Sequence, residues 1–160
     1  MLPMYYVWYA PLYRNSIVSA DSACLQTAIQ LIAEAVGGER EDELFYQYLI
    51  SIAPAKDEKE IIASIQADEK KHNRMFRSIY RELTGQEAVP KNEEPFVQPA
   101  NYADGIRKAL FGELRAVEKY RKIRECLPRE GPYRDMLFEI ITDELKHADK
   151  YNFLFTLNHV

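Results

Sequence analysis

Apolar residues recur every three or four positions along four long segments of the chain, which is the spacing of an α-helix that buries one face. The segments cover roughly residues 21–53, 55–83, 102–126 and 133–157. Asp21 or Ser22 can cap the first helix, and Pro54 ends it. Gly85 suits the C-terminal cap of the second helix. Gly37-Gly38 lowers helix propensity inside the first segment, but the apolar pattern continues through it, so a single helix is predicted there.

The connections between these segments predict how the helices are arranged. Short turns at residues 53–55 and 128–132 contain proline or glycine and would form two antiparallel helical hairpins. Residues 85–99 contain three prolines and have no helical period, so they form a long loop that joins one hairpin to the other. The predicted fold is all-α: an antiparallel four-helix bundle of two hairpins joined by a long crossover.

The N-terminal residues 1–20 differ from the rest of the chain. Four of residues 5–9 are aromatic, and Tyr13 follows. The stretch lacks the basic region and small-residue cleavage site of a signal peptide, and Pro3 and Pro11 disfavour a helix interior. We expect an extended aromatic arm that packs on the bundle or on a partner subunit, with residues 21–160 forming the bundle domain. The alternative is a disordered tail, although such tails are usually poor in aromatics.

Composition narrows the class of protein. A chain of 160 residues, 47% hydrophobic and 29% charged, is ordinary for one globular domain. The net charge of −4 gives no reason to expect nucleic acid or an anionic membrane as partner, and no apolar run is long enough for a membrane span. Cys24 and Cys126 form no C-x-x-C pair, which excludes a zinc ribbon or a rubredoxin-type iron site within the chain. We expect both to be free thiols in a reducing cytoplasm.

Two copies of Glu-x-x-His interrupt the apolar faces of the second and fourth segments: Glu69 with His72, and Glu144 with His147. A spacing of three places carboxylate and imidazole on one helix face, about one turn apart. An ionised glutamate is costly on a buried face, and a metal ion held by both side chains would offset that cost. One such pair on a charged helix is usually solvent-exposed, but two copies in register with the core pattern favour metal binding.

The first and third segments also share a pattern, A-x-x-G-E-x6-Y. It contains Glu39 and Tyr46 in the first copy, and Glu113 and Tyr120 in the second. In both copies a Glu-x-x-His follows at nearly the same distance. The chain therefore contains two copies of one unit, in which a helix with a glutamate is followed by a helix with Glu-x-x-His. Two copies of this length predict one closed bundle rather than a repeat array.

The repeat predicts that all four helices direct metal-binding side chains to one place. Four carboxylates would balance two divalent cations, and mixed oxygen and nitrogen ligands rich in carboxylate suit iron or manganese better than zinc or copper. Asp68 and Asp143 each precede a Glu-x-x-His and can accept the second N–H of the histidine on the opposite hairpin. The predicted metal ligands are Glu39, Glu69, His72, Glu113, Glu144 and His147.

This set of residues resembles the ligand set of the ferritin-like di-iron carboxylate bundles, and the Gly-Glu-x6-Tyr detail is most similar to the rubrerythrin branch. The resemblance covers about residues 21–157 and implies a centre of two iron ions, with manganese as the alternative. It implies terminal ligands (Glu39, Glu113), bridging ligands (Glu69, Glu144) and one histidine for each metal (His72, His147). It also implies hydrogen bonds from Tyr46 and Tyr120 to ligand carboxylates, although both could instead be ordinary core tyrosines.

Two features depart from the rubrerythrin pattern. Ala116 stands where that family commonly has a further carboxylate, whereas Asp42 occupies the corresponding place in the first segment and could supply an extra ligand. The rubredoxin domain that donates electrons in that family is missing, so electrons would have to come from a separate protein.

Three functions remain open. The first is a di-iron oxidoreductase that acts on peroxide or dioxygen. The second is a ferroxidase or another iron-handling protein, and the third is a non-enzymatic bundle that uses its metal for stability. For an enzyme of the first kind we expect a cytoplasmic homodimer, whereas an iron-storage cage would have a mass of several hundred kilodaltons.

Overall fold

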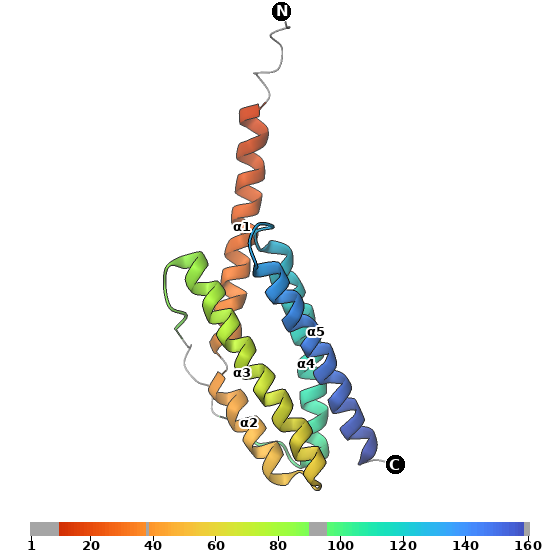
Figure 1. Cartoon of the computed structure of the whole chain (residues 1–160). Coiled ribbons are helices and arrows are strands. Elements are labelled where there is room, and N and C mark those ends of the chain that lie inside the picture. The colour runs from red at the N-terminus through yellow and green to blue at the C-terminus, as the bar shows by residue number, and fades with distance from the viewer. Residues whose placement is uncertain (1–9, 38, 90–95, 159–160) are drawn as a thin grey trace, which may run out of the picture.

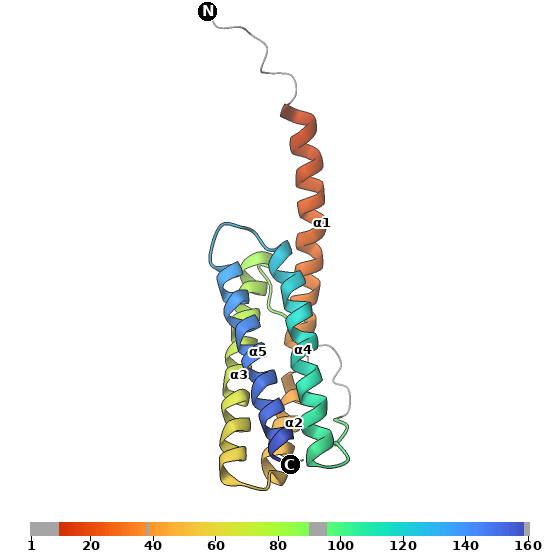
Figure 2. The same cartoon turned by 90° about the vertical axis from the view of Figure 1, so that its right-hand side faces the viewer.

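The structure is a computed structural model that describes residues 10–37, 39–89 and 96–158, with side chains described from Ser22 onward except at positions 39 and 40. It contains five helices: α1 (Ala10–Gly37), α2 (Glu39–Ile52), α3 (Lys56–Thr84), α4 (Tyr102–Cys126) and α5 (Tyr133–Leu157). Helices α1 and α2 follow each other along one corner of the bundle, and α3 ends and α4 begins at opposite ends of it (Figures 1 and 2). The antiparallel four-helix bundle is confirmed. None of the described helices is long and apolar enough to cross a membrane.

The first helix of the bundle differs from the prediction, because it is divided in two. Helix α1 ends at Gly37 and α2 begins at Glu39. Two adjacent glycines each cost about 1 kcal/mol of helix propensity relative to alanine, which makes this the weakest point of the segment. The apolar pattern continues across the break, and this is why the sequence alone predicted one continuous helix.

Helix α1 also begins earlier than predicted, at Ala10 instead of Asp21 or Ser22. Pro11 lies in its first turn, where the missing N–H of proline costs no hydrogen bond. The first turns of α1 extend past the end of the α4–α5 hairpin (Figure 1). The extended arm predicted for residues 1–20 is therefore wrong from residue 10 onward, and residues 1–9 lie outside the described part of the chain. The division into an arm and a bundle domain stays a prediction.

Two clusters of buried apolar residues fill the bundle, one on each side of a polar layer. On α3, Ile65 belongs to one cluster and Phe76 to the other, with buried His72 between them. On α5, Ile140 and Tyr151 flank the layer in the same way. The two apolar clusters therefore close the polar layer above and below, along the axis of the bundle.

Two glycines shape the ends of the bundle. Helices α2 and α4 approach so closely at Gly105 that a Cβ there would lie 2.4 Å from Cδ2 of Leu49. Gly85 adopts the left-handed conformation (φ 71°) and donates its N–H to the carbonyl of Arg81 at 2.8 Å. The predicted C-terminal cap of α3 is thus confirmed.

A disulfide joins α1 to the last residue of α4. Cys24 and Cys126 lie 102 residues apart in sequence, with their Cα atoms 5.0 Å apart. The prediction of two free thiols is wrong, because it considered each cysteine only on its own helix, whereas the pairing follows from how α1 packs against α4. Disulfides are rare in reducing compartments, so the argument for a reducing cytoplasm is lost as well.

We expect the double substitution Cys24→Ser/Cys126→Ser to lower the free energy of unfolding by about 2–4 kcal/mol, because the disulfide restricts a long loop of the unfolded chain. Urea titrations with and without dithiothreitol would measure the effect. The reductant should destabilise the wild type and leave the double variant unchanged. A wild type that is insensitive to reductant would show that this disulfide does not stabilise the fold.

Candidate metal centre

Five of the six predicted ligands converge between the two apolar clusters. Helix α3 contributes Glu69 and His72, α5 contributes Glu144 and His147, and α4 contributes Glu113. Both histidines, Glu113 and Glu144 are buried, with Glu144 1% and His147 0% exposed. Ligand atoms of Glu69, Glu113, Glu144 and His147 all lie within 4.8 Å of one another. The Nδ1 atom of His72 lies 3.2 Å from a Glu144 oxygen and so belongs to the same group.

The sixth predicted ligand, Glu39, is the first residue of α2. Its side chain lies outside the described part of the structure. Helix α1 ends at Gly37, two residues before Glu39, and the role of Glu39 as a ligand stays a prediction.

Four buried ligand atoms make no hydrogen bond to any described residue: Oε1 of Glu69, Oε1 of Glu144, and Nδ1 of His72 and His147. They lie close to one another, with Nδ1 of His147 3.1 Å from Oε1 of Glu69, yet not in hydrogen-bonding geometry. A buried polar atom without a partner costs about 1–3 kcal/mol. Cations that accept all four lone pairs would remove this cost, so the residues present fit a metal centre of carboxylate and imidazole ligands.

The other ring nitrogen of each histidine contacts an aspartate on the opposite hairpin. His72 Nε2 lies 3.1 Å from Oδ2 of Asp143, and His147 Nε2 lies 3.1 Å from Oδ2 of Asp68. An Nε2–H that donates to a carboxylate leaves Nδ1 as the atom that faces the centre. The sequence suggested this exchange between hairpins, because each aspartate directly precedes a Glu-x-x-His.

Without metal, the crowded carboxylates hold protons in the centre. Burial alone would lower the histidine pKa values, but Glu144 and Glu69 outweigh it and raise the pKa of His72 to about 10 and that of His147 to about 9. Burial, together with the neighbouring Glu144, raises the pKa of Glu113 far above its usual value. Carboxylates this close together in a largely buried site cannot all ionise.

Three buried tyrosines surround the carboxylates. Tyr46 and Tyr120 lie beside the centre as predicted, and burial and the nearby carboxylates raise their pKa values. Among the described residues, neither donates a hydrogen bond to a ligand carboxylate, so that role stays a prediction. Tyr151 is fully buried, and its hydroxyl has no hydrogen-bond partner in the described structure. Tyr151 lies one turn after His147 on α5, and this spacing is the one signal for it in the sequence.

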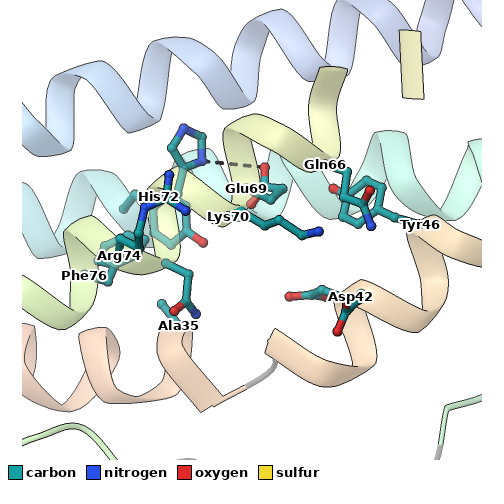
Figure 3. Close-up of a pocket in the computed structure, with 12 residues that line it drawn as sticks. Ala35, Asp42, Tyr46, Gln66, Glu69, Lys70, His72, Arg74 and Phe76 are labelled. Atoms are coloured by element: carbon teal, nitrogen blue, oxygen red, sulfur yellow. Dashed lines mark ion pairs between the residues drawn. The ribbon is translucent and has the colours of Figure 1, made fainter. Parts of the chain in front are cut away.

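Two cavities, of about 340 and 400 Å³, reach the centre beside the α1–α2 junction. Both are lined by Asp42 and Glu69, and Figure 3 shows Asp42 across the first cavity from Glu69 and His72. Desolvation and the charge of Glu69 raise the pKa of Asp42 to about 6. Ala116, where the expected carboxylate is missing, lines the second cavity together with Asp42. Small molecules can therefore approach the centre from this side.

The bundle and its buried Glu and His residues define a ferritin-like protein with a candidate metal site. A family model for rubrerythrin matches residues 30–154, so the chain belongs to the rubrerythrin family. An uncharacterised Bacillus subtilis (strain 168) protein, YhjR, is 29% identical over 97 residues, which are 61% of this chain and 66% of that protein, just under two thirds of its length. A hypothetical protein from Pyrococcus furiosus has a similar structure, with a TM-score of 0.67, 26% identity, and coverage of 83% of this chain and 89% of that one.

We expect the metal-free protein to become less stable as the pH rises from 6.5 toward 10. The raised pKa values of His72 and His147 mean that their contribution is complete below the unfolded value of about 6.5 and is lost above the folded values. The raised pKa of Glu113 acts in the same direction, because the folded state binds the extra proton. Metal must displace these protons, so metal affinity should rise over the same interval.

Melting temperatures of metal-free protein at pH 6.5 and pH 9 would test this expectation, with metal-loaded protein as the control. The metal-loaded form should change much less, because metal replaces the protons at the centre. A melting temperature of the metal-free form that is constant or rises with pH would contradict the account.

Proposed function

We propose that the protein is a di-iron oxidoreductase of the rubrerythrin type that acts on hydrogen peroxide or dioxygen. The observation that carries the proposal is the set of buried ligand atoms without hydrogen-bond partners on Glu69, His72, Glu144 and His147. In a protein of this family, such a donor set is best explained by metal, and its oxygen-rich composition favours iron, with manganese as the alternative.

Distances within the centre support two bridging carboxylates. Glu144 lies 3.2 Å from Nδ1 of His72 and 3.8 Å from Nδ1 of His147. Glu69 lies 3.1 Å from Nδ1 of His147 and 3.6 Å from Nδ1 of His72. Each carboxylate is thus near both imidazole nitrogens, as a ligand shared by two metals would be. We infer that each histidine would hold one metal.

The remaining ligands differ between the two sides of the centre. Glu113 lies 3.9 Å from Nδ1 of His147, which supports a terminal role beside that histidine. By the symmetry of the repeat, Glu39 would serve beside His72. Asp42 faces the same cavities as Glu69, and we keep it as a candidate extra ligand.

Two iron ions in this centre would each supply one electron, which matches the two-electron reduction of peroxide to water. Asp68 and Asp143 hold the histidine ligands in place, and the two apolar clusters limit the access of bulk water along the bundle axis. Small oxidants could enter through the cavities beside Asp42. Cys24 and Cys126 pair with each other, so neither could hold a rubredoxin-type iron. The electrons that restore the reduced state would therefore come from a donor outside these 160 residues.

We further propose that the protein forms a homodimer. Exposed apolar side chains on α4 and α5, among them Phe111 and Phe138 (53% and 57% exposed), could take part in such a contact. A cytoplasmic location also stays a proposal, and the Cys24–Cys126 disulfide weighs against a strongly reducing compartment. The mass in solution would separate a dimer from a storage cage.

Reduced, iron-loaded protein should be oxidised quickly by hydrogen peroxide in a stopped-flow experiment and should then stall until an electron donor is added. The reason is that the centre stores two electrons, enough for one peroxide. If dioxygen oxidises the centre much faster than peroxide and ferric mineral accumulates, the protein is a ferroxidase. If neither oxidant changes the spectrum, the metal serves only the stability of the bundle.

A matched pair of variants controls this experiment. Glu144→Ala removes a buried carboxylate from the centre, whereas Glu118→Ala removes an exposed one from α4. The first should lose most of its iron and its reaction with peroxide, and the second should retain both. Equal loss in the two variants would contradict the assignment of the ligands.

A further inference from the structure

One lysine connects the hydrogen-bond partners of both histidines. The Nζ atom of Lys146 lies 2.6 Å from Oδ1 of Asp143 and 3.1 Å from Oδ2 of Asp68. The same two aspartates contact His72 and His147 through their Nε2 atoms. A single ammonium group therefore lies between the two aspartates that contact the histidines, Asp68 on α3 and Asp143 on α5.

The repeat contains an equivalent lysine that lacks this arrangement. Lys71 precedes His72 just as Lys146 precedes His147, but Lys71 forms its ion pair with Glu139. Within the described residues it makes no ion pair with Asp68 or Asp143. The bridge is thus specific to one copy of the repeat and does not follow from the motif alone.

The aspartates need such a partner to hold their positions. The side chains of Asp68 and Asp143 are 30% and 18% exposed, so water competes for their oxygens. Two carboxylates that contact one ammonium also lie close enough to repel each other. The ammonium group removes that repulsion and leaves each aspartate directed at a histidine, which in turn keeps Nδ1 of that histidine directed at the centre.

We propose that Lys146 is a positioning residue for the metal centre, which it orders by tying together the two aspartates that orient His72 and His147. The inference rests on the metal centre proposed above. Through its two ion pairs, the partly exposed Lys146 would fix the position of one hairpin relative to the other at the ligands. Loss of the bridge would allow both imidazole rings to change orientation, so the affinity for metal should fall at both histidines together.

Lys146→Met and Lys71→Met form a matched pair, because each removes one positive charge from a side chain of nearly equal exposure, 47% and 46%. Titration of the metal-free proteins with Co(II), followed by visible absorption, would give the affinities. We expect Lys146→Met to bind about 10-fold or more weakly than wild type, the loss typical when a hydrogen-bond partner of a ligand is disturbed. Lys71→Met should stay close to wild type.

Two further readouts separate positioning from a general loss of stability. Lys146→Arg should restore most of the affinity, because a guanidinium can contact both carboxylates. In nitrogen NMR spectra of the metal-free proteins, the ring signals of His72 and His147 should change in Lys146→Met and remain as in wild type in Lys71→Met. The melting temperatures of the two metal-free methionine variants should differ little, since the two lysines are almost equally exposed, 47% and 46%, and ion pairs of such lysines add little stability.

Three results would overturn the proposal. Equal affinity losses in the two methionine variants would indicate a general effect of charge. A Lys146→Arg variant as weak as Lys146→Met would rule out the bridge. Both of these results leave the proposed metal centre standing, provided that the wild type binds Co(II). The third result is a wild type that binds no Co(II), which would overturn the proposed function together with this inference.

Discussion

The structure depends on the burial of several carboxylates and two imidazoles in the middle of an apolar bundle. Glu144 and His147 are almost completely buried, and the ligand atoms that face each other have no hydrogen-bond partners among the described residues. Protons can balance part of the negative charge, as the raised pKa values of Glu113 and the histidines indicate. Protons on the histidines and metal cations compete for the same Nδ1 atoms, and divalent cations would neutralise more of the buried carboxylate charge.

The same constraint explains how the two hairpins are held together. Each Glu-x-x-His lies on one hairpin, but the aspartate that contacts its histidine belongs to the other. Lys146 joins the two aspartates, and the disulfide joins α1 to the end of α4. The hairpins thus meet through polar contacts at mid-height, through a covalent bond near one end, and through apolar clusters between. Metal binding should therefore stabilise the whole bundle, since it acts where both hairpins contribute.

Most of the bundle could be predicted from periodicity, because its helices bury one face and most of them end close to a proline or glycine. The predicted bounds of α4 and α5 agree with the structure, and those of α3 differ by one residue at each end. The ligands on these helices could be predicted for the same reason: charged residues on an apolar face stand out. The break after Gly37 was missed, because the apolar pattern does not change there and only the summed helix propensity does.

Other features could not be predicted, because they depend on contacts between elements. The pairing of Cys24 with Cys126 needs the packing of α1 on α4. Lys146 looks like any solvent-exposed lysine until Asp68 is seen beside it. Tyr151 looks like an ordinary core tyrosine until its hydroxyl is found without a partner in the described structure. Sequence patterns show which face of a helix is buried, but they do not show which side chains meet there.

We propose that two metal ions would share the carboxylates of Glu69 and Glu144. A crystal structure of iron-loaded protein, with diffraction data collected at the iron absorption edge, tests it most directly. We expect two anomalous peaks about 3.5–4 Å apart, the usual separation in two-metal sites, with both carboxylates between them and one histidine beside each. A single peak, no peak, or carboxylates turned away from the iron would contradict it.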